Sequence, residues 1–364
     1  MQVLIGILAF ILMLSVIVII HELGHFIAAR SFGVHCHEFS IGMGPKLYSR
    51  QGKHTIFSIR AIPLGGYVMM AGEEDGSQNL DEEEQDDPDN WLKDVPESER
   101  LYSKPVWQQI IIMAAGVFMN LVLALVIFIG LNVYSGYAAE PALPVVQTTE
   151  AGYPAAEAGL QGGDRIVSIQ AEDGAVLEPE TLEQVSEFLQ FNHGEAVYTI
   201  EREDKTFEVT MAPVYDEENK GYLLGFTAER NVRKIGFWEA VGQGFVDLWD
   251  NITLIFRTLG QLFQGKGLES VSGPVGIYNV TTQVVSMGLL PYISLFALIS
   301  VNIGVFNLLP VPALDGGRIL ILALEKLFRR KIPTKVVEGI IMASFVLLFG
   351  LMIFATYNDI VRMF

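Results

Sequence analysis

Four apolar stretches of the chain predict membrane-spanning helices. Each is long enough to cross about 30 Å of hydrocarbon, which takes roughly 20 residues. The first runs without a charged residue from Val3 to Ile20 and continues at helical spacing to about Arg30. A cleavable signal peptide is the alternative for it, but no basic residue precedes it and no small-residue cleavage site follows it. We therefore expect four retained spans, placed within residues 1–30, 105–135, 287–328 and 334–358.

The polar segment between the first two spans, residues 31–104, divides into two parts. Residues 38–72 alternate in places with period two and are punctuated by Gly and Pro, which predicts short strands and turns. Residues 73–99 contain 13 acidic residues and one Lys, with few apolar anchors. For them we expect a solvated, flexible loop.

The next polar segment predicts a small α/β domain in residues 140–228. It carries a Gly-bounded turn, an amphipathic helix and alternating strands. The stretch PAAEAGLQGGDRI, residues 154–166, closely resembles the small-residue helix and G-D-x-I turn of a PDZ domain. In the circularly permuted order of bacterial proteases, this resemblance assigns the carboxylate-binding loop to Tyr222, Leu223, Leu224, Gly225 and Phe226.

Residues 235–266 predict an amphipathic helix. Apolar side chains recur there at steps of three and four, while acidic residues and Arg257 interrupt any membrane span. We expect the helix to lie in the membrane interface. Packing of the same apolar stripe against the α/β domain is the alternative.

The composition fits a membrane protein that carries water-facing modules. Hydrophobic residues make up 51% of the chain and charged residues 18%, with a mean hydropathy of +0.37. The net charge of −18 argues against nucleic acid as a partner. A single cysteine, Cys36, excludes an intramolecular disulfide.

Basic residues predict the orientation in the membrane. The loop between the third and fourth spans carries Lys326, Arg329, Arg330, Lys331 and Lys335. Loops rich in Lys and Arg face the cytoplasm. Alternation then places both termini and residues 136–288 outside, with residues 31–104 inside.

The end of the first span carries the sequence HELGH, residues 21–25. On a helix, His21 and His25 lie on one face one turn apart, so the two imidazoles can share a metal ion, with Glu22 beside them as a general base. A chance occurrence of the motif is the alternative. Ionisable residues inside a span are costly and usually mark function, which favours a metal site.

A catalytic zinc ion needs a third protein ligand. His35 and His37 share one face of a strand but lie ten residues beyond the motif, so we expect structural roles for them. A better candidate is Asp315, which stands beside Gly316 and Gly317 in an apolar helix broken by prolines. Such a break must be buried in protein or line a cavity. Asp315 capping the next helix is the alternative, and capping does not exclude ligation.

The depth of these residues in the membrane is consistent with one site. At about 1.5 Å per residue, the apolar run before His21 carries it roughly 27 Å inward. Asp315 lies just before the basic loop on the cytoplasmic side. Both positions along the chain therefore place these residues near the cytoplasmic face of the membrane.

The whole chain resembles the site-2 protease family of intramembrane zinc metalloproteases, in particular its bacterial RseP/RasP-like branch. HELGHF, FSIGMGPKL, IPLGGYV, AAGVFMNLVLA, SGPVGI and NLLPVPALDGG occur in the family's order. The resemblance implies one PDZ domain in this chain, whereas proteobacterial members usually carry two. The predicted fold class is thus a polytopic α-helical membrane protein of four transmembrane helices, with a membrane-associated β segment and one extracytoplasmic PDZ domain.

The resemblance implies the roles of individual residues. One zinc ion would be held by His21, His25 and Asp315, with Glu22 as the base. Asn307 would act in substrate binding or oxyanion support, and Asn302 is a second candidate. The strand edge that receives the unwound substrate is assigned to Gly65, Gly66, Tyr67 and Val68.

The predicted function is cleavage of transmembrane segments of single-span proteins or signal-peptide remnants in a bacterial cell membrane. An upstream site-1-type protease would make a first cut outside. The PDZ domain would bind the new C-terminus or exclude large ectodomains, and the sequence does not choose between these roles. A non-proteolytic PDZ adaptor with a structural metal is the main alternative. A transporter is a third, but it needs polar residues in several spans, and the second and fourth offer little beyond Asn120.

Overall fold

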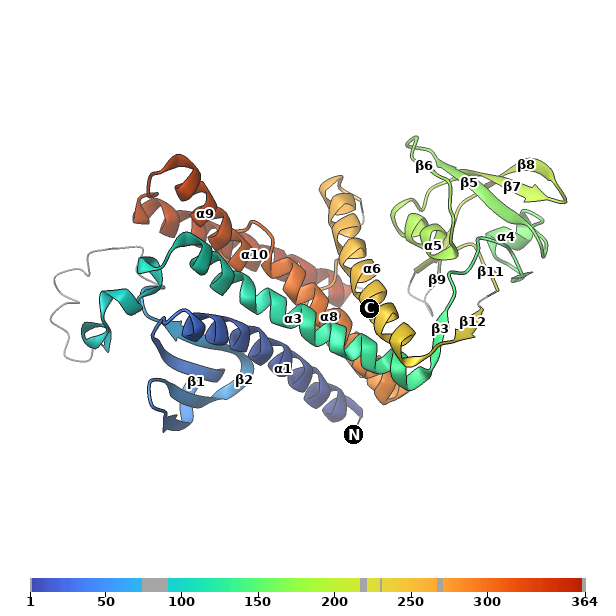
Figure 1. Cartoon of the computed structure of the whole chain (residues 1–364). Coiled ribbons are helices and arrows are strands. Elements are labelled where there is room, and N and C mark those ends of the chain that lie inside the picture. Colours follow the sequence, from blue (N-terminus) through green and yellow to red (C-terminus); the bar gives the residue numbers. More distant parts are fainter. Residues whose placement is uncertain (1, 74–90, 217–220, 230, 267–270, 362–364) are drawn as a thin grey trace. The chain divides into compact units, whose positions relative to one another are not determined.

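The computed structural model describes residues 2–73, 91–216, 221–229, 231–266 and 271–361. The chain divides into two compact units. Unit 1 comprises residues 1–131, 244–256 and 271–364, and unit 2 comprises residues 132–243 and 257–270. Figure 1 shows the elements of both units along the chain.

Among the described residues, four helices are long and apolar enough to cross a membrane: α1 (Gln2–Ser31), α3 (Val106–Ser135), α8 (Leu289–Asn307) and α10 (Thr334–Val361). A helix satisfies its backbone polar groups internally, which is what a lipid environment requires. The chain is therefore a polytopic membrane protein, as the apolar pattern predicted.

The third span ends where the prolines stand. After α8 stops at Asn307, residues 308–314 form tight turns, and α9 (Asp315–Phe328) begins. A Cβ at Gly316 would run into the carbonyl groups of Leu308 and Leu309, and one at Gly317 into that of Val311. The two glycines therefore let the start of α9 pack directly on the turn, which places Asp315 beside the end of α8.

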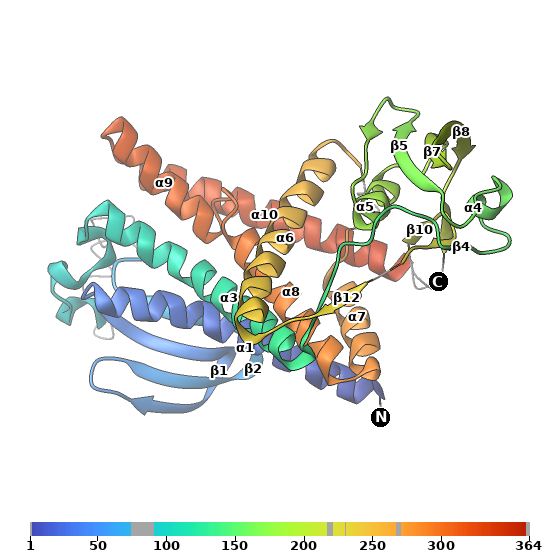
Figure 2. The same cartoon turned by 45° about the vertical axis from the view of Figure 1, so that its right-hand side comes forward.

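A curled sheet lies along α1 in unit 1 (Figure 2). Short strands were expected in residues 38–72, but the structure has two long bent strands, β1 (Cys36–Gln51) and β2 (Ile56–Met70). Each bends because Gly42, Gly44 and Gly65 adopt positive φ angles of 85°, 82° and 90°. Residues 38–41 pair with 66–69 on one side and with 56–59 on the other. In the described pairing, residues 66–70 thus form one edge of the sheet.

The prediction of a flexible loop at residues 73–99 is partly wrong. Residues 74–90 lie outside the described residues. Residue Glu73 is only 19% exposed at its side chain and forms an ion pair with Arg318, so it belongs to the packed structure. The remaining residues form 3-10 turns: η1 (Trp91–Asp94), η2 (Glu97–Glu99) and, just beyond, η3 (Leu101–Ser103).

Helix α7 (Pro274–Met287) was not predicted. It packs on α1, α8 and α10. Its N-terminus is capped from another helix, because Oδ2 of the buried Asp359 accepts hydrogen bonds from the N–H groups of Gly273 at 2.8 Å and Gly276 at 2.7 Å. A carboxylate at a helix N-terminus satisfies free N–H groups and the helix dipole together. This contact explains why glycines stand in the SGPVGI stretch, since a Cβ at Gly276 would lie 2.6 Å from Oδ1 of Asp359.

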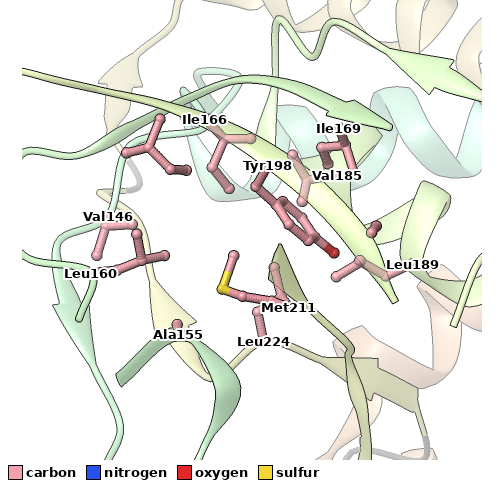
Figure 3. Close-up of a cluster of buried hydrophobic side chains, with 12 residues drawn as sticks. Val146, Ala155, Leu160, Ile166, Ile169, Val185, Leu189, Tyr198, Met211 and Leu224 are labelled. Carbon is pink, nitrogen blue, oxygen red and sulfur yellow. The ribbon is translucent and has the colours of Figure 1, made fainter. Parts of the chain in front are cut away.

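Unit 2 is an α/β unit built on a four-stranded sheet in the order β6-β5-β7-β8. Its core gathers apolar side chains around Tyr198, which is fully buried (Figure 3). The elements of the unit are β3 (Tyr137–Ala139), β4 (Thr148–Thr149), α4 (Pro154–Glu157), β5 (Arg165–Ala171), β6 (Val176–Leu177), α5 (Leu182–Phe191), β7 (Ala196–Arg202), β8 (Lys205–Met211), β9 (Val214–Asp216), β10 (Gly221–Leu223), β11 (Phe226–Thr227) and β12 (Val232–Lys234).

Helix α6 (Phe237–Phe263) lies within the predicted amphipathic stretch. It exposes large aromatic side chains: Phe237, Trp238, Phe245, Trp249, Phe256 and Phe263. Exposed apolar side chains in such number on one helix are consistent with the predicted amphipathic character. Its position in the membrane interface remains a prediction.

Candidate metal centre

Three side chains from two helices meet in unit 1. His21 and His25 stand one turn apart on α1, and their Nε2 atoms are 3.2 Å apart. Oδ2 of Asp315, in the first turn of α9, lies 3.1 Å from Nε2 of His21 and 3.4 Å from Nε2 of His25. Both imidazoles are buried. In the described part of the chain, these three residues form a group that could hold a metal ion.

The spacing of the three atoms fits zinc. Tetrahedral ligands about 2.05 Å from a zinc ion lie about 3.3 Å from one another. The measured separations of 3.1, 3.2 and 3.4 Å agree with this value. Apart from the two imidazole nitrogens 3.1 and 3.4 Å away, the buried Oδ2 of Asp315 has no polar partner among the described residues, and burying a carboxylate in this way is costly unless a cation meets it. Two imidazoles and a carboxylate are a ligand set of catalytic zinc, which keeps a fourth position open.

Helix α3 makes room for the two imidazoles. A Cβ at Gly116 would lie 2.8 Å from Nε2 of His21 and closer still to Nε2 of His25, so only glycine fits there. One turn earlier, the carbonyl of Ile112 lies 2.8 Å from Nδ1 of His25. With Nδ1–H donating to this carbonyl, Nε2 of His25 keeps its lone pair for a metal. One turn later, Nδ2 of Asn120 lies 3.3 Å from Nδ1 of His21.

Gly116 and Asn120 were not among the predicted site residues. The sequence did hold a signal for them, because an amide inside an apolar span is rare and usually functional. The glycine stands four residues before it, on the same helix face. Nothing in the sequence, however, shows that this face meets the histidines.

A cavity of about 340 Å³ opens beside the three residues. Glu22 lines it together with His21, His25 and Asp315, and so do residues of α8, α9 and β2. A Cβ placed on Gly66 would lie 3.7 Å from Cγ of Glu22, so the strand edge comes close to this carboxylate. The cavity therefore brings a free carboxylate, the candidate metal ligands and a sheet edge together.

The ion pair of Glu73 and Arg318 also lines the cavity. Glu73 follows β2, and Arg318 stands one turn after Asp315 on α9. Burial raises the pKa of Glu73, although Arg318 opposes that shift. This pair joins the β segment to the helix that carries the third candidate ligand, and sequence reasoning did not anticipate it.

The predicted substrate-binding residues of unit 1 fall in different places. Asn307, Tyr67 and Val68 line the cavity, and Gly65 and Gly66 continue the same strand. Asn302 is not among the residues that line it, and its Nδ2 donates to the carbonyl of Leu298 on its own helix at 3.0 Å.

The predicted carboxylate-binding loop lies in unit 2, where Tyr222, Leu223 and Leu224 lead into Gly225 and Phe226. Gly225 has a φ of 74° and packs against Tyr153, so a side chain there would be strained and crowded. The side chain of Gln190 on α5 bonds the backbone of Tyr222 twice: Nε2 donates to the carbonyl at 3.1 Å, and Oε1 accepts from the N–H at 3.3 Å.

The site defines a metal-dependent hydrolase in a membrane protein, because three zinc-type ligands and a separate carboxylate share one cavity. Comparisons with known proteins agree. Residues 9–351 match the profile of peptidase family M50. The chain is 31% identical to the zinc metalloprotease RasP of Shouchella clausii, over 98% of this chain and 99% of that one.

Two further relatives cover the chain as fully. CPE1693 of Clostridium perfringens is 35% identical over 99% of each chain, and SAS1196 of Staphylococcus aureus is 33% identical over 100% of each. Both carry provisional zinc metalloprotease names. The chain belongs to peptidase family M50, the site-2 protease family, and is a zinc metalloprotease. The predicted resemblance and enzyme class are thereby confirmed.

Proposed function

We propose that this protein cleaves transmembrane segments of single-span membrane proteins or signal-peptide remnants, using one zinc ion at His21, His25 and Asp315. The observation that carries the proposal is the near-tetrahedral spacing of the three ligand atoms beside the carboxylate of Glu22 in one cavity. When bound, zinc would supply Lewis acidity toward the scissile carbonyl and activate a water molecule.

Glu22 is the proposed general base. It follows His21 directly on α1 and lines the cavity. Its carboxylate would take a proton from the attacking water and deliver it to the departing amine. Asn307 lines the same cavity and is the proposed support for the substrate or its oxyanion. Asn302 is the weaker candidate, since its amide donates within its own helix.

The edge of β2 at Gly65, Gly66, Tyr67 and Val68 is the proposed docking strand. A helical substrate hides its carbonyl groups in its own hydrogen bonds, so it must unwind before cleavage. Strand addition along residues 66–70, which pair with β1 on one side in the described pairing, would replace those bonds. The approach of Gly66 to Glu22 supports this edge over the opposite one.

Unit 2 is proposed to be an extracytoplasmic PDZ domain that acts as a size filter. The amide of Gln190 bonds both backbone groups of Tyr222, as a residue of an added strand would. This contact favours steric exclusion over capture of a C-terminus at that strand. Cleavage that stays equally fast when a folded domain is fused to the substrate's outer end would contradict the filter role.

The proposed location is a bacterial cell membrane, with both termini and unit 2 outside and the metal centre near the cytoplasmic face. The five basic residues around the end of α9 and the start of α10 support this orientation. An upstream site-1-type protease is the proposed supplier of substrates with shortened ectodomains, and α6 is the proposed interfacial helix.

The decisive experiment compares the wild type with Glu22→Gln on a tethered single-span substrate in proteoliposomes. The variant should retain zinc and its unfolding temperature but leave the substrate uncut, because the amide accepts no proton. Turnover by the wild type should stop with 1,10-phenanthroline and return with added zinc. Undiminished cleavage by Glu22→Gln would refute the role of Glu22, and the absence of zinc-dependent turnover would favour the non-proteolytic adaptor.

A further inference from the structure

Asn120 is a polar side chain buried completely inside an apolar span. It does not line the cavity, so it has no direct access to a substrate there. Its backbone carbonyl accepts a hydrogen bond from Oγ of Ser300 on α8 at 2.8 Å. Burying an amide in such a place is costly unless its polar atoms find partners.

The amide of Asn120 faces one of the candidate zinc ligands. Its Nδ2 lies 3.3 Å from Nδ1 of His21, while its Oδ1 is buried without a partner among the described residues. An NH2 group only donates, so this orientation makes Nδ1 of His21 an acceptor and leaves the ring proton on Nε2. A protonated Nε2 cannot bind a metal.

Rotation of the amide by 180° about the Cβ–Cγ bond removes both problems. The oxygen and nitrogen ends have nearly the same shape, so they exchange places without other movement. Oδ1 then accepts from Nδ1–H of His21, which gives the orphaned oxygen a partner and turns the lone pair of Nε2 toward His25 and Asp315.

The geometry points to Asn120 as a positioning residue that holds His21 in its metal-binding tautomer by accepting the Nδ1–H bond. The same helix holds the other histidine in this way, because the carbonyl of Ile112 lies within hydrogen-bond distance of Nδ1 of His25. Ile112, Gly116 and Asn120 follow one another at intervals of one helical turn. Ile112 offers an acceptor to His25, Gly116 leaves space for both imidazoles, and Asn120 offers an acceptor to His21. This inference rests on the proposed zinc site.

The test measures zinc affinity by competition with a chromophoric chelator, in a Glu22→Gln background so that no turnover is needed. Asn120→Leu keeps the branching of the side chain but removes the acceptor, and should weaken zinc binding about 10–100-fold. Asn120→Asp keeps an acceptor and should bind zinc at least as tightly as the parent. A merely structural role for Asn120 would not produce this rescue by Asp.

Ser300→Ala is the matched control, because it removes a buried hydrogen bond to Asn120 without touching the amide, and its zinc affinity should equal the parent's. Equal affinity in Asn120→Leu and the parent would overturn the inference. So would weakened binding in Asn120→Asp, which remains informative if Asn120→Leu does not fold. Absence of zinc binding in the parent itself would instead refute the proposed zinc site.

Discussion

The substitution Gly116→Ala separates metal binding from folding, because it should weaken metal binding far more than it changes the stability of the protein. In a helix interior, alanine is favoured over glycine by about 1 kcal/mol, so α3 itself should gain stability. The added Cβ would lie 2.8 Å from Nε2 of His21, whereas ordinary contacts begin at 3.4 Å. The imidazole would therefore have to move by at least about 0.6 Å, beyond the roughly 0.2 Å that a metal site tolerates.

A displacement of this size should weaken zinc binding at least about 100-fold, or about 2.7 kcal/mol. Zinc affinity is measured by chelator competition and stability by thermal unfolding of the zinc-free protein in detergent. The control is Gly130→Ala on the same helix, where the new Cβ meets no described atom within 4 Å beyond its chain neighbours and the backbone of its own helix. It should leave zinc binding unchanged. If Gly116→Ala bound zinc as tightly as the wild type, the close packing of α3 against the two histidines would be refuted.

Two further predictions concern buried carboxylates away from the candidate metal centre. Asp359→Ala should lower the free energy of unfolding by about 3 kcal/mol, because two N–H groups at the start of α7 then lack their charged acceptor. Asp359→Asn should lower the free energy of unfolding by less. No change in thermal unfolding in Asp359→Ala would refute the capping role. In unit 2, hydrogen bonds from Arg202 to the buried Asp164, at 2.6 and 2.7 Å, lower the pKa of that carboxyl. Its contribution to stability is therefore fully present above the unfolded pKa of about 3.9 and lost as the pH falls through the lower folded value. The stability difference between wild type and Asp164→Asn should shrink below pH 4, and a difference that does not depend on pH would contradict this.

The candidate zinc ligands were readable from single stretches of sequence. Helical spacing indicates His21 and His25 as candidate ligands. The position of Asp315 at a turn with prolines and glycines indicates it as the third candidate. The four spans follow from run lengths alone, since lipid leaves a helix as the only form for such segments. These features are local, so one stretch of chain suffices to specify each of them.

Other features depend on which surfaces meet, and no local pattern carries that information. Helix α7 was missed because its residues have no strong period and are held by Asp359 from a distant helix. The long bent strands were read as short ones because glycines at positive φ interrupt the alternation without ending the sheet. Glu73 looked like the start of a solvated acidic run, but Arg318 on α9 holds it at the cavity.

The sequence alone thus determined the candidate ligands, the number of predicted spans and the membrane environment, because these follow from residue identity and spacing along one segment. Only the tertiary structure decided how the ligands are seated. Gly116 matters because α3 crosses the two histidines at that residue, and Asn120 because its amide faces Nδ1 of His21. Such contacts join residues about one hundred positions apart, and packing between helices rather than any local preference brings them together.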